Sequence, residues 1–246
     1  MMRGAPVLIL GARSDMALAI AHGFAKRGHP LMLALRSPNR LQPLVADFKI
    51  RYGVEVTLHA YNATKLTGQA AFLEALPHEP RIVISAVGLM TDQDQAAGDA
   101  QLAKQVVETN FLGPALMLEM AAAKLAALSE PAAIVGIGSV AGDRGRAKNY
   151  VYGAAKAGFA AWLSGLRQKY ANSELHVMTV KPGFVRTQMT AGMDLPGPVT
   201  VDPEAVAQDI LRGLDKKHEV VYTSVWRWIM TIICAIPEPI FKKLKF

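Results

Sequence analysis

The most constraining feature of this 246-residue sequence is a regular alternation of short β-type runs with segments of helical periodicity. Such an alternation is typical of a parallel sheet with helices on both faces, because each crossover between parallel strands needs room for a helix. A chain of this length can bury one large core, so we expect a single doubly wound α/β domain with about seven parallel strands. The candidate strands are residues 7–10, 31–35, 54–59, 81–86, 132–138, 175–181 and 219–223.

The longest helical segment, at about 99–128, carries residues that disrupt helices in its centre. Asn110, Gly113 and Pro114 all fall there. A proline removes one backbone donor and clashes with the preceding turn. We therefore expect a bend or a break in this helix close to Asn110.

The clearest chemical signal is a serine, a tyrosine and a lysine at fixed spacing. Ser139 follows an apolar run, Tyr152 comes thirteen residues later, and Lys156 four residues after that. Residues four apart share a helix face, so the ammonium group would stand beside the phenol and favour its ionised form. A tyrosine of ordinary pKa about 10 then becomes a usable acid or base near neutral pH. A tyrosine and a lysine at this spacing also occur in many helices without function, but the strand that ends at Ser139 favours a carbonyl-binding site.

The turn between the first strand and the first helix occupies the place where a Rossmann-type fold binds a dinucleotide. Gly11 permits a tight turn and Ala17 permits close packing, as a phosphate-binding loop requires. Asp15, however, stands where a glycine is usual and adds negative charge near the pyrophosphate. The turn alone fits an ordinary loop as well as a nucleotide site, and its position after the first strand favours the nucleotide site.

The end of the second strand lacks the acidic residue that would bind an adenosine ribose. Residues 34–37 read ALRS, and Arg36, with Arg13 opposite it, suits a ribose phosphate instead. This charge pattern favours NADPH over NADH. The alternative is that Arg36 is a solvated residue at the start of a loop.

These features together resemble the short-chain dehydrogenase/reductase family, and the resemblance covers nearly the whole chain. The family's active-site pattern matches Asn110, Ser139, Tyr152 and Lys156 in order and context. The resemblance implies a carbonyl reductase or alcohol dehydrogenase in which NADPH delivers a hydride while Tyr152 protonates the developing alkoxide. It also implies that Ser139 orients the oxygen, that Lys156 holds the ribose and lowers the tyrosine pKa, and that Asn110 anchors a water.

The same resemblance implies the residues around the cofactor and the kind of assembly. Residues 85–88 read SAVG where the family usually has NNAG, and Asn62 stands where an aspartate commonly meets adenine. We expect a homo-oligomer, a dimer or a tetramer, that acts on a small-molecule or lipid-linked carbonyl compound. The implied cofactor-binding residues are Gly11, Arg13, Ser14, Asp15, Met16, Arg36, Asn62, Ala63, Ala86, Gly88, Tyr152, Lys156, Pro182, Gly183, Val185 and Thr187.

Residues 225–246 form a tail that differs from the dinucleotide-binding domain expected over residues 1–224. The tail begins with a strongly apolar run, is interrupted by two prolines and ends in lysines. The run is too short for a bilayer span, which needs about twenty apolar residues, but its tryptophans and lysines suit a segment lying in the membrane interface. The alternative is a tail that packs on a partner subunit or over the substrate pocket. The apolar face expected from helical spacing consists of Trp226, Ile229, Met230 and Ile233.

One branch of the family resembles this chain further: the decaprenylphosphoryl keto-pentose (2-keto-ribose) reductases of arabinan precursor synthesis. Residues 142–146 and the proline-broken, lysine-rich tail are similar to those of that branch. The resemblance implies a keto sugar on a polyprenyl phosphate as substrate, with Arg144, Arg146 and Lys148 beside the pocket. Two alternatives stay open: a reductase of a soluble ketone whose tail serves oligomer assembly, and a non-catalytic NADPH-binding protein.

Composition argues against several other classes of protein. A formal net charge of +7 suits a phosphate ligand or an anionic membrane, and without a basic run interleaved with aromatic residues we expect no nucleic-acid binding. The single cysteine, Cys234, excludes an internal disulfide, and six scattered histidines lack ligand spacing, so we expect no metal site. The first apolar run is too short for a signal peptide. We expect a cytoplasmic protein that contacts the inner face of the membrane through residues 225–246.

Overall fold

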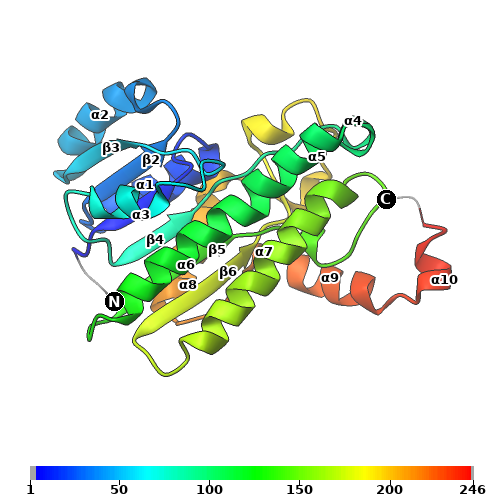
Figure 1. The fold of residues 1–246 in the computed structure, drawn as a ribbon. Helices are drawn as coiled ribbons and strands as arrows, with labels where there is room; N and C mark the ends of the chain where they lie inside the picture. The colour runs from blue at the N-terminus through cyan, green and yellow to red at the C-terminus, as the bar shows by residue number, and fades with distance from the viewer. Residues whose placement is uncertain (1–3, 245–246) are drawn as a thin grey trace.

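Seven parallel strands form the central sheet of the computed structural model, which describes residues 4–244 (Figure 1). Each strand overlaps one of the seven candidate segments, so the predicted fold class is confirmed. The sheet reverses direction of growth at β1, which pairs with β2 on one side and β4 on the other. In spatial order the strands are β3 (Val56–Ala60), β2 (Leu31–Leu35), β1 (Val7–Leu10), β4 (Ile82–Ser85), β5 (Ala132–Ile137), β6 (Leu175–Lys181) and β9 (Val220–Tyr222).

Helices cover both faces of the sheet because successive strand residues point to opposite sides. Val7 and Ile9 of β1 belong to one core, while Leu8 and Leu10 belong to the other. Figure 1 shows α5, α6 and α7 running across the near face. The first core also contains residues of α1 (Asp15–Ala25), α2 (Gln42–Tyr52) and α8 (Pro203–Asp215). The second contains residues of α3 (Gln69–Glu74), α6 (Gly113–Ala126) and α7 (Tyr150–Lys169).

The expected break in the long central helix is present as a π-helical segment. It is η2 (Glu108–Leu112), which lies between α5 (Ala100–Val107) and α6 and contains Asn110. Pro114 lies just after this segment and has no N–H to donate to the preceding turn, which fits the local change in hydrogen bonding. A Cβ on Gly113 would lie 2.1 Å from the Ala63 carbonyl oxygen, so only glycine allows this close approach. The short helix α4 (Gln93–Gly98) precedes α5.

A small second sheet lies beyond β6 and was not among the predicted strands. It pairs β7 (Phe184–Val185) with β8 (Thr200–Val201), two strands too short to leave a sequence pattern. Between them the chain forms the 3₁₀ turns η4 (Gln188–Thr190) and η5 (Gly197–Val199). Two further 3₁₀ turns are η1 (Pro38–Leu41) and η3 (Val140–Gly142).

The C-terminal tail folds into α9 (Trp226–Ala235) and α10 (Glu238–Phe241), drawn in orange to red in Figure 1. Trp226 and Met230 are 5% and 2% exposed and pack with Val140 of η3, the turn that follows β5. The prediction that this face of the helix contacts a membrane is therefore wrong, because its central residues are buried against the rest of the domain. The exposed apolar side chains of α9 are instead Trp228 and Ile232, at 70% and 67%. Among residues 4–244, no helix is both long enough and apolar enough to cross a bilayer.

Candidate active site

The carboxyl ends of the central strands bring Ser139, Tyr152 and Lys156 together. Ser139 follows β5, and its hydroxyl caps the turn η3 by accepting from the Ala141 N–H at 3.1 Å. Tyr152 and Lys156 lie on successive turns at the start of α7. The Tyr152 phenol interacts with the Ser139 side chain, which by itself lowers the pKa of the phenol. The structure thus joins the serine and the tyrosine that the spacing predicted as a pair.

The environment of Tyr152 keeps its phenol protonated. Burial raises the pKa of Tyr152 to about 12, and the hydrogen bond with Ser139 only partly opposes this rise. The expectation that the pKa would be lowered is therefore wrong for this state of the site. A protonated phenol is the form that can donate a proton to an oxygen atom.

Lys156 explains why that expectation is not met. Its Nζ donates to the Ile137 carbonyl oxygen at 3.0 Å and lies 5.8 Å from the centroid of the Tyr152 ring. Within residues 4–244 it makes no hydrogen bond to the phenol. The residue is 3% exposed, and burial lowers the pKa of Lys156 to about 8. The ammonium is thus itself destabilised by desolvation, which weakens its effect on the phenol.

Asn110 is fully buried and holds the segment after β4 against η2. Its Nδ2 donates to the carbonyl oxygens of Leu89 and Val106 at 2.6 and 2.9 Å, and its Oδ1 accepts from the Leu89 N–H at 3.1 Å. A Cβ on Gly88 would lie 3.4 Å from Asn110 Oδ1 and 3.9 Å from Lys156 Nζ. Asn110, the fourth residue of the catalytic tetrad formed with Ser139, Tyr152 and Lys156, therefore lies close to Lys156. Its expected role of anchoring a water stays a prediction.

The glycine turn after β1 has the geometry that a phosphate loop needs. Gly11 has a φ of +79°, and a Cβ there would lie 2.9 Å from the Ala86 carbonyl oxygen, so a side chain is excluded on two grounds. Its N–H and that of the next residue donate to the Ala34 carbonyl oxygen at the end of β2. Ser14 caps α1 by accepting from the Ala17 N–H at 3.1 Å, and Met16 is partly buried in the first turn. The N-terminus of α1 thus lies at the switch point of the sheet, where open α/β sheets bind their ligands.

Two arginines lie exposed at the edge of this turn. Arg13 belongs to the turn itself, and Arg36 directly follows β2. Within residues 4–244, neither guanidinium group has a hydrogen bond or an ion pair. Both can therefore receive a phosphate without breaking an existing contact.

The remaining predicted cofactor residues line the same edge of the sheet. Asn62 follows β3 and uses its Oδ1 to accept from the N–H and hydroxyl of Thr64. Ala63 and Ala86 are buried beside Gly113 and Gly11 respectively. These residues shape the backbone of the cleft more than they offer free polar groups to it.

The proline-glycine turn after β6 is packed against the tail. A Cβ on Gly183 would lie 1.9 Å from Trp226 Nε1, so the indole ring lies directly over the glycine. The same Nε1 donates to the Val199 carbonyl oxygen at 2.8 Å. Val185 of β7 is buried, and Thr187 caps the start of η4 with its hydroxyl 3.3 Å from that of Thr190. The tail therefore packs directly against the turn formed by Pro182 and Gly183.

Arg144 has a different role from the expected one. Its Nη1 donates to the carbonyl oxygens of Ile233 and Ile236 at 2.7 and 2.6 Å, where it caps the end of α9. Its Nη2 bonds Glu238 at 2.8 Å, and its Cζ lies 3.7 Å from the centroid of the Phe241 ring. The guanidinium is thus committed to the tail instead of being free for an anionic substrate. Of the other two basic residues in this loop, Arg146 is partly buried and Lys148 is exposed.

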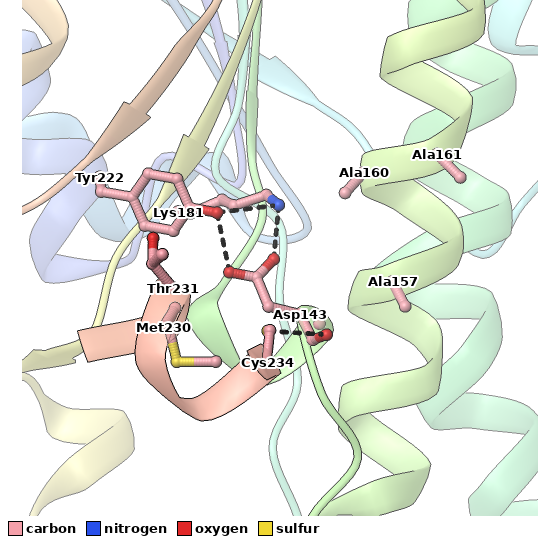
Figure 2. A pocket seen from close by; sticks show the side chains of 10 residues that line it. Asp143, Ala157, Ala160, Ala161, Lys181, Tyr222, Met230, Thr231 and Cys234 are labelled. Atoms are coloured by element: carbon pink, nitrogen blue, oxygen red, sulfur yellow. Dashed lines mark hydrogen bonds and ion pairs between the residues drawn. The ribbon is translucent and has the colours of Figure 1, made fainter. Parts of the chain in front are cut away.

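A cavity of about 510 Å³ lies behind this loop, between α7, β9 and α9, and no tetrad residue lines it (Figure 2). Lys181 Nζ lies 2.5 Å from Asp143 Oδ1, and the Tyr222 hydroxyl donates to Asp143 Oδ2 at 2.9 Å. Cys234 Sγ lies 3.6 Å from the Asp143 carbonyl oxygen. Sequence reasoning missed this network because its members come from segments far apart in the chain, with no spacing that pairs them.

Comparison with known proteins places this geometry in a family. The family model described as short chain dehydrogenase matches residues 5–195. An uncharacterized oxidoreductase of Mycobacterium tuberculosis is 33% identical over 221 residues, covering 89% of this chain and 88% of that protein. Carbonyl reductase family member 4 of Danio rerio is 29% identical over 230 residues, covering 86% and 91%.

Among solved structures, a short-chain dehydrogenase from Sphingobium yanoikuyae in complex with NADPH superposes with a TM-score of 0.81. It is 25% identical, and the match covers 98% of this chain and 96% of that one. The chain therefore belongs to the short-chain dehydrogenase family and is an NAD(P)-dependent oxidoreductase.

Proposed function

We propose that the protein is an NADPH-dependent reductase that converts a ketone to an alcohol at Ser139, Tyr152 and Lys156. The single observation that carries this proposal is that the Tyr152 phenol interacts with the Ser139 side chain, with Lys156 one helical turn from Tyr152. Two hydroxyl groups that meet at the carboxyl end of a parallel sheet can bind one carbonyl oxygen between them. In this proposal residues 1–224 form the catalytic domain and residues 225–246 its C-terminal extension.

The residues around the first turn fit a dinucleotide with a ribose phosphate. Gly11 leaves room for backbone approach, and the helix α1 directs its N–H groups and its positive dipole end at the place of the pyrophosphate. Arg13 and Arg36 supply guanidinium groups that have no partner among residues 4–244 and that suit a 2′-phosphate. The NADPH held by the relative from Sphingobium yanoikuyae supports the same choice of cofactor.

Among the chain's own residues, Tyr152 acts as the acid. When bound, the dinucleotide supplies the hydride. Tyr152 donates its phenolic proton to the substrate oxygen, while Ser139 donates a hydrogen bond that orients that oxygen. Protonated Lys156 stabilises the tyrosinate that remains after proton transfer. The pKa of Tyr152, raised to about 12, keeps the acid loaded at neutral pH.

The tail supports a lipid-linked substrate, such as the polyprenyl-phosphate keto sugar that the branch resemblance implies. Trp228, Ile232, Ile240 and Leu244 are exposed apolar side chains, and Arg227, Lys242 and Lys243 are exposed cations on the same segment. An apolar face with flanking cations suits the headgroup region of an anionic membrane. We propose that this face holds the protein at the inner surface of the membrane, next to its substrate.

The cofactor proposal is tested by titrating NADPH and NADH into the protein and following nicotinamide fluorescence. Wild-type protein should bind NADPH more tightly, and Arg36→Ala should weaken NADPH binding about 10- to 100-fold because a charge-assisted hydrogen bond is lost. Binding of NADH should not change. Equal affinities in the wild type, or an unchanged preference in the variant, would contradict this choice of cofactor.

The substrate proposal is tested with a double variant, Trp228→Glu and Ile232→Glu, and vesicles that contain an anionic lipid. The variant should lose co-sedimentation with vesicles and reduction of a polyprenyl-phosphate keto sugar, while NADPH binding is kept because the buried face of α9 is untouched. Ile50→Glu is the matched control, since Ile50 is 84% exposed on α2. If the double variant instead splits an oligomer into smaller species and keeps its vesicle binding, the tail serves assembly and a soluble ketone becomes the better substrate.

A further inference from the structure

We propose that Asp15 is a positioning residue, a latch that ties the turn η4 across the cofactor cleft and slows release of the dinucleotide. The inference rests on the proposed function, because it needs a dinucleotide in that cleft. The inference assigns a role to Asp15, which stands where a glycine-rich phosphate loop usually has a glycine.

The latch itself is a single bond between distant parts of the chain. Asp15 is the first residue of α1, and its Oδ2 accepts the backbone N–H of Gln188 at 2.7 Å, across 173 residues of sequence. Gln188 is in turn the first residue of η4. The bond therefore joins the helix expected to face the pyrophosphate to the segment that follows the proline-glycine turn.

The segment that Asp15 holds is locally stiff. The Thr190 hydroxyl lies 3.1 Å from the Thr187 N–H and donates to the Val185 carbonyl oxygen at 2.7 Å. These bonds fold residues 187–190 into one capped turn. Fixing a single point of such a turn positions all of it, because its internal hydrogen bonds carry the constraint.

The side chain of Met189, the middle residue of the turn, extends toward the catalytic residues. The methyl group of Met189 would lie 3.6 Å from a Cβ on Gly88, and that same point is 3.4 Å from Asn110 Oδ1 and 3.9 Å from Lys156 Nζ. The turn thus reaches from the start of α1 to the neighbourhood of Lys156. In this proposal the dinucleotide extends between these two places and passes under the turn.

The chemistry of the bond explains why an aspartate suits this position. A carboxylate accepts a stronger hydrogen bond from an N–H than a neutral oxygen does. The N-terminus of α1 also stabilises a negative charge at its first residue. A glycine here would remove the charge near the pyrophosphate, but it would leave η4 without its attachment to α1.

Two variants break the same bond from opposite sides. Asp15→Ala removes the acceptor together with its charge, whereas Gln188→Pro removes only the donor N–H and keeps the charge. Proline is compatible with the first position of a helical turn, and Thr187 before it is extended, with φ −141° and ψ 168°. Asp94→Ala is the matched control, because Asp94 is an exposed first-turn aspartate of α4 with no partner among residues 4–244.

The experiment measures dissociation of NADPH by stopped-flow fluorescence after a chase with excess NADP⁺. Asp15→Ala and Gln188→Pro should each speed dissociation about tenfold, and the double variant should be no faster than either one, because both remove one bond. Asp94→Ala should match the wild type. If Asp15 acts only as a misplaced charge, Asp15→Ala slows dissociation and Gln188→Pro changes nothing, which overturns the latch.

A second readout needs no cofactor. The amide of Gln188 should exchange its hydrogen about tenfold faster in Asp15→Ala than in the wild type when both proteins are free of dinucleotide. Protection lost in the variant supports the bond even if the wild type binds neither NADPH nor NADH, in which case the proposed function fails. Unchanged exchange together with unchanged dissociation would overturn the latch and leave the proposed function standing.

Discussion

Lys156 donates to the last residue of β5 and Lys181 to Asp143 in the loop after it, and the surroundings of the two lysines differ in the presence of a carboxylate. Among residues 4–244, Lys156 Nζ makes a hydrogen bond only to a carbonyl oxygen, and burial lowers the pKa of Lys156 to about 8. Around Lys181, burial acts in the same direction, but the hydrogen bonds and charge of Asp143 and the contact with Tyr222 raise its pKa instead (Figure 2). A nearby carboxylate thus decides whether a lysine drawn out of water stays firmly charged.

The difference separates two kinds of site at one end of the sheet. Lys181 and Asp143 neutralise each other and hold the loop to the last strands of the sheet, beside the tail. Lys156 has no ion pair within residues 4–244, so its charge remains available to the phenol and to a bound ligand. We therefore expect substitutions around Lys181 to change stability and substitutions around Lys156 to change chemistry.

The largest expected effect is the loss of activity in Tyr152→Phe. Removing the hydroxyl removes the proton donor while the ring stays in place, so carbonyl reduction should fall about 10³-fold. The decrease is measured as NADPH oxidation at saturating cofactor. NADPH affinity and thermal unfolding should stay close to those of the wild type, and Tyr150→Phe, on an exposed neighbour, should keep full activity. Wild-type turnover in Tyr152→Phe would show that another group is the acid.

The next largest effect is a loss of stability in Lys181→Met. Asp143 would remain largely buried without its cation, which should lower the free energy of unfolding by about 2–3 kcal/mol. Urea unfolding measures the change. Adding Asp143→Asn should recover most of the loss, because the uncompensated charge is then gone. If Lys181→Met alone were as stable as the wild type, the claim that Lys181 has a structural role would be contradicted.

Lys156→Met should change stability in the opposite direction. The native pKa of about 8 lies below the ordinary value of 10.5, so the folded state holds this proton less tightly than the unfolded state. The cost is fully present below pH 8 and disappears as pH rises from about 8 to 10.5. After allowing for the lost bond to Ile137, the variant should be about 1–2 kcal/mol more stable at pH 7 and inactive. The difference in unfolding free energy between Lys156→Met and the wild type should shrink between pH 8 and 10.5. A difference that stays constant over this range would contradict the linkage between the pKa of Lys156 and stability.

The smallest effect is a pH dependence of the wild-type rate. Tyr152 stays protonated up to about pH 12, whereas Lys156 loses its proton near pH 8. Reduction should therefore fall to half near pH 8 and continue to fall about tenfold per pH unit above it. Measuring kcat from pH 6 to 10 tests this. A rate that stays flat to pH 10 would mean that the charge of Lys156 is not used.

The strands and the catalytic residues could be read from the sequence because both depend on local patterns. The runs at 7–10, 31–35 and 175–181 coincide with β1, β2 and β6. The spacing from Ser139 to Tyr152 survives in the structure because one end is fixed by a strand and the other by a helix. The geometry that brings these two residues together is that of a parallel sheet.

The contacts between distant segments could not be read in the same way. The apolar tail suggested two possible faces, and only packing against Gly183 decides that Trp226 is buried and Trp228 is exposed. Arg144 looked free for a substrate because its acceptors are backbone carbonyls at the end of α9, about 90 residues later. Asp15 looked like a defect because its partner is the backbone of Gln188.

The most direct test of this account is a titration of the lysine side chains by NMR, with the Cε carbons labelled and Lys156→Met used for assignment. The account predicts that Lys156 titrates near pH 8 and that Lys181 stays protonated to above the ordinary value of 10.5. A titration of Lys156 at or above pH 10.5, or of Lys181 below it, would contradict the division between a reactive lysine and a structural one.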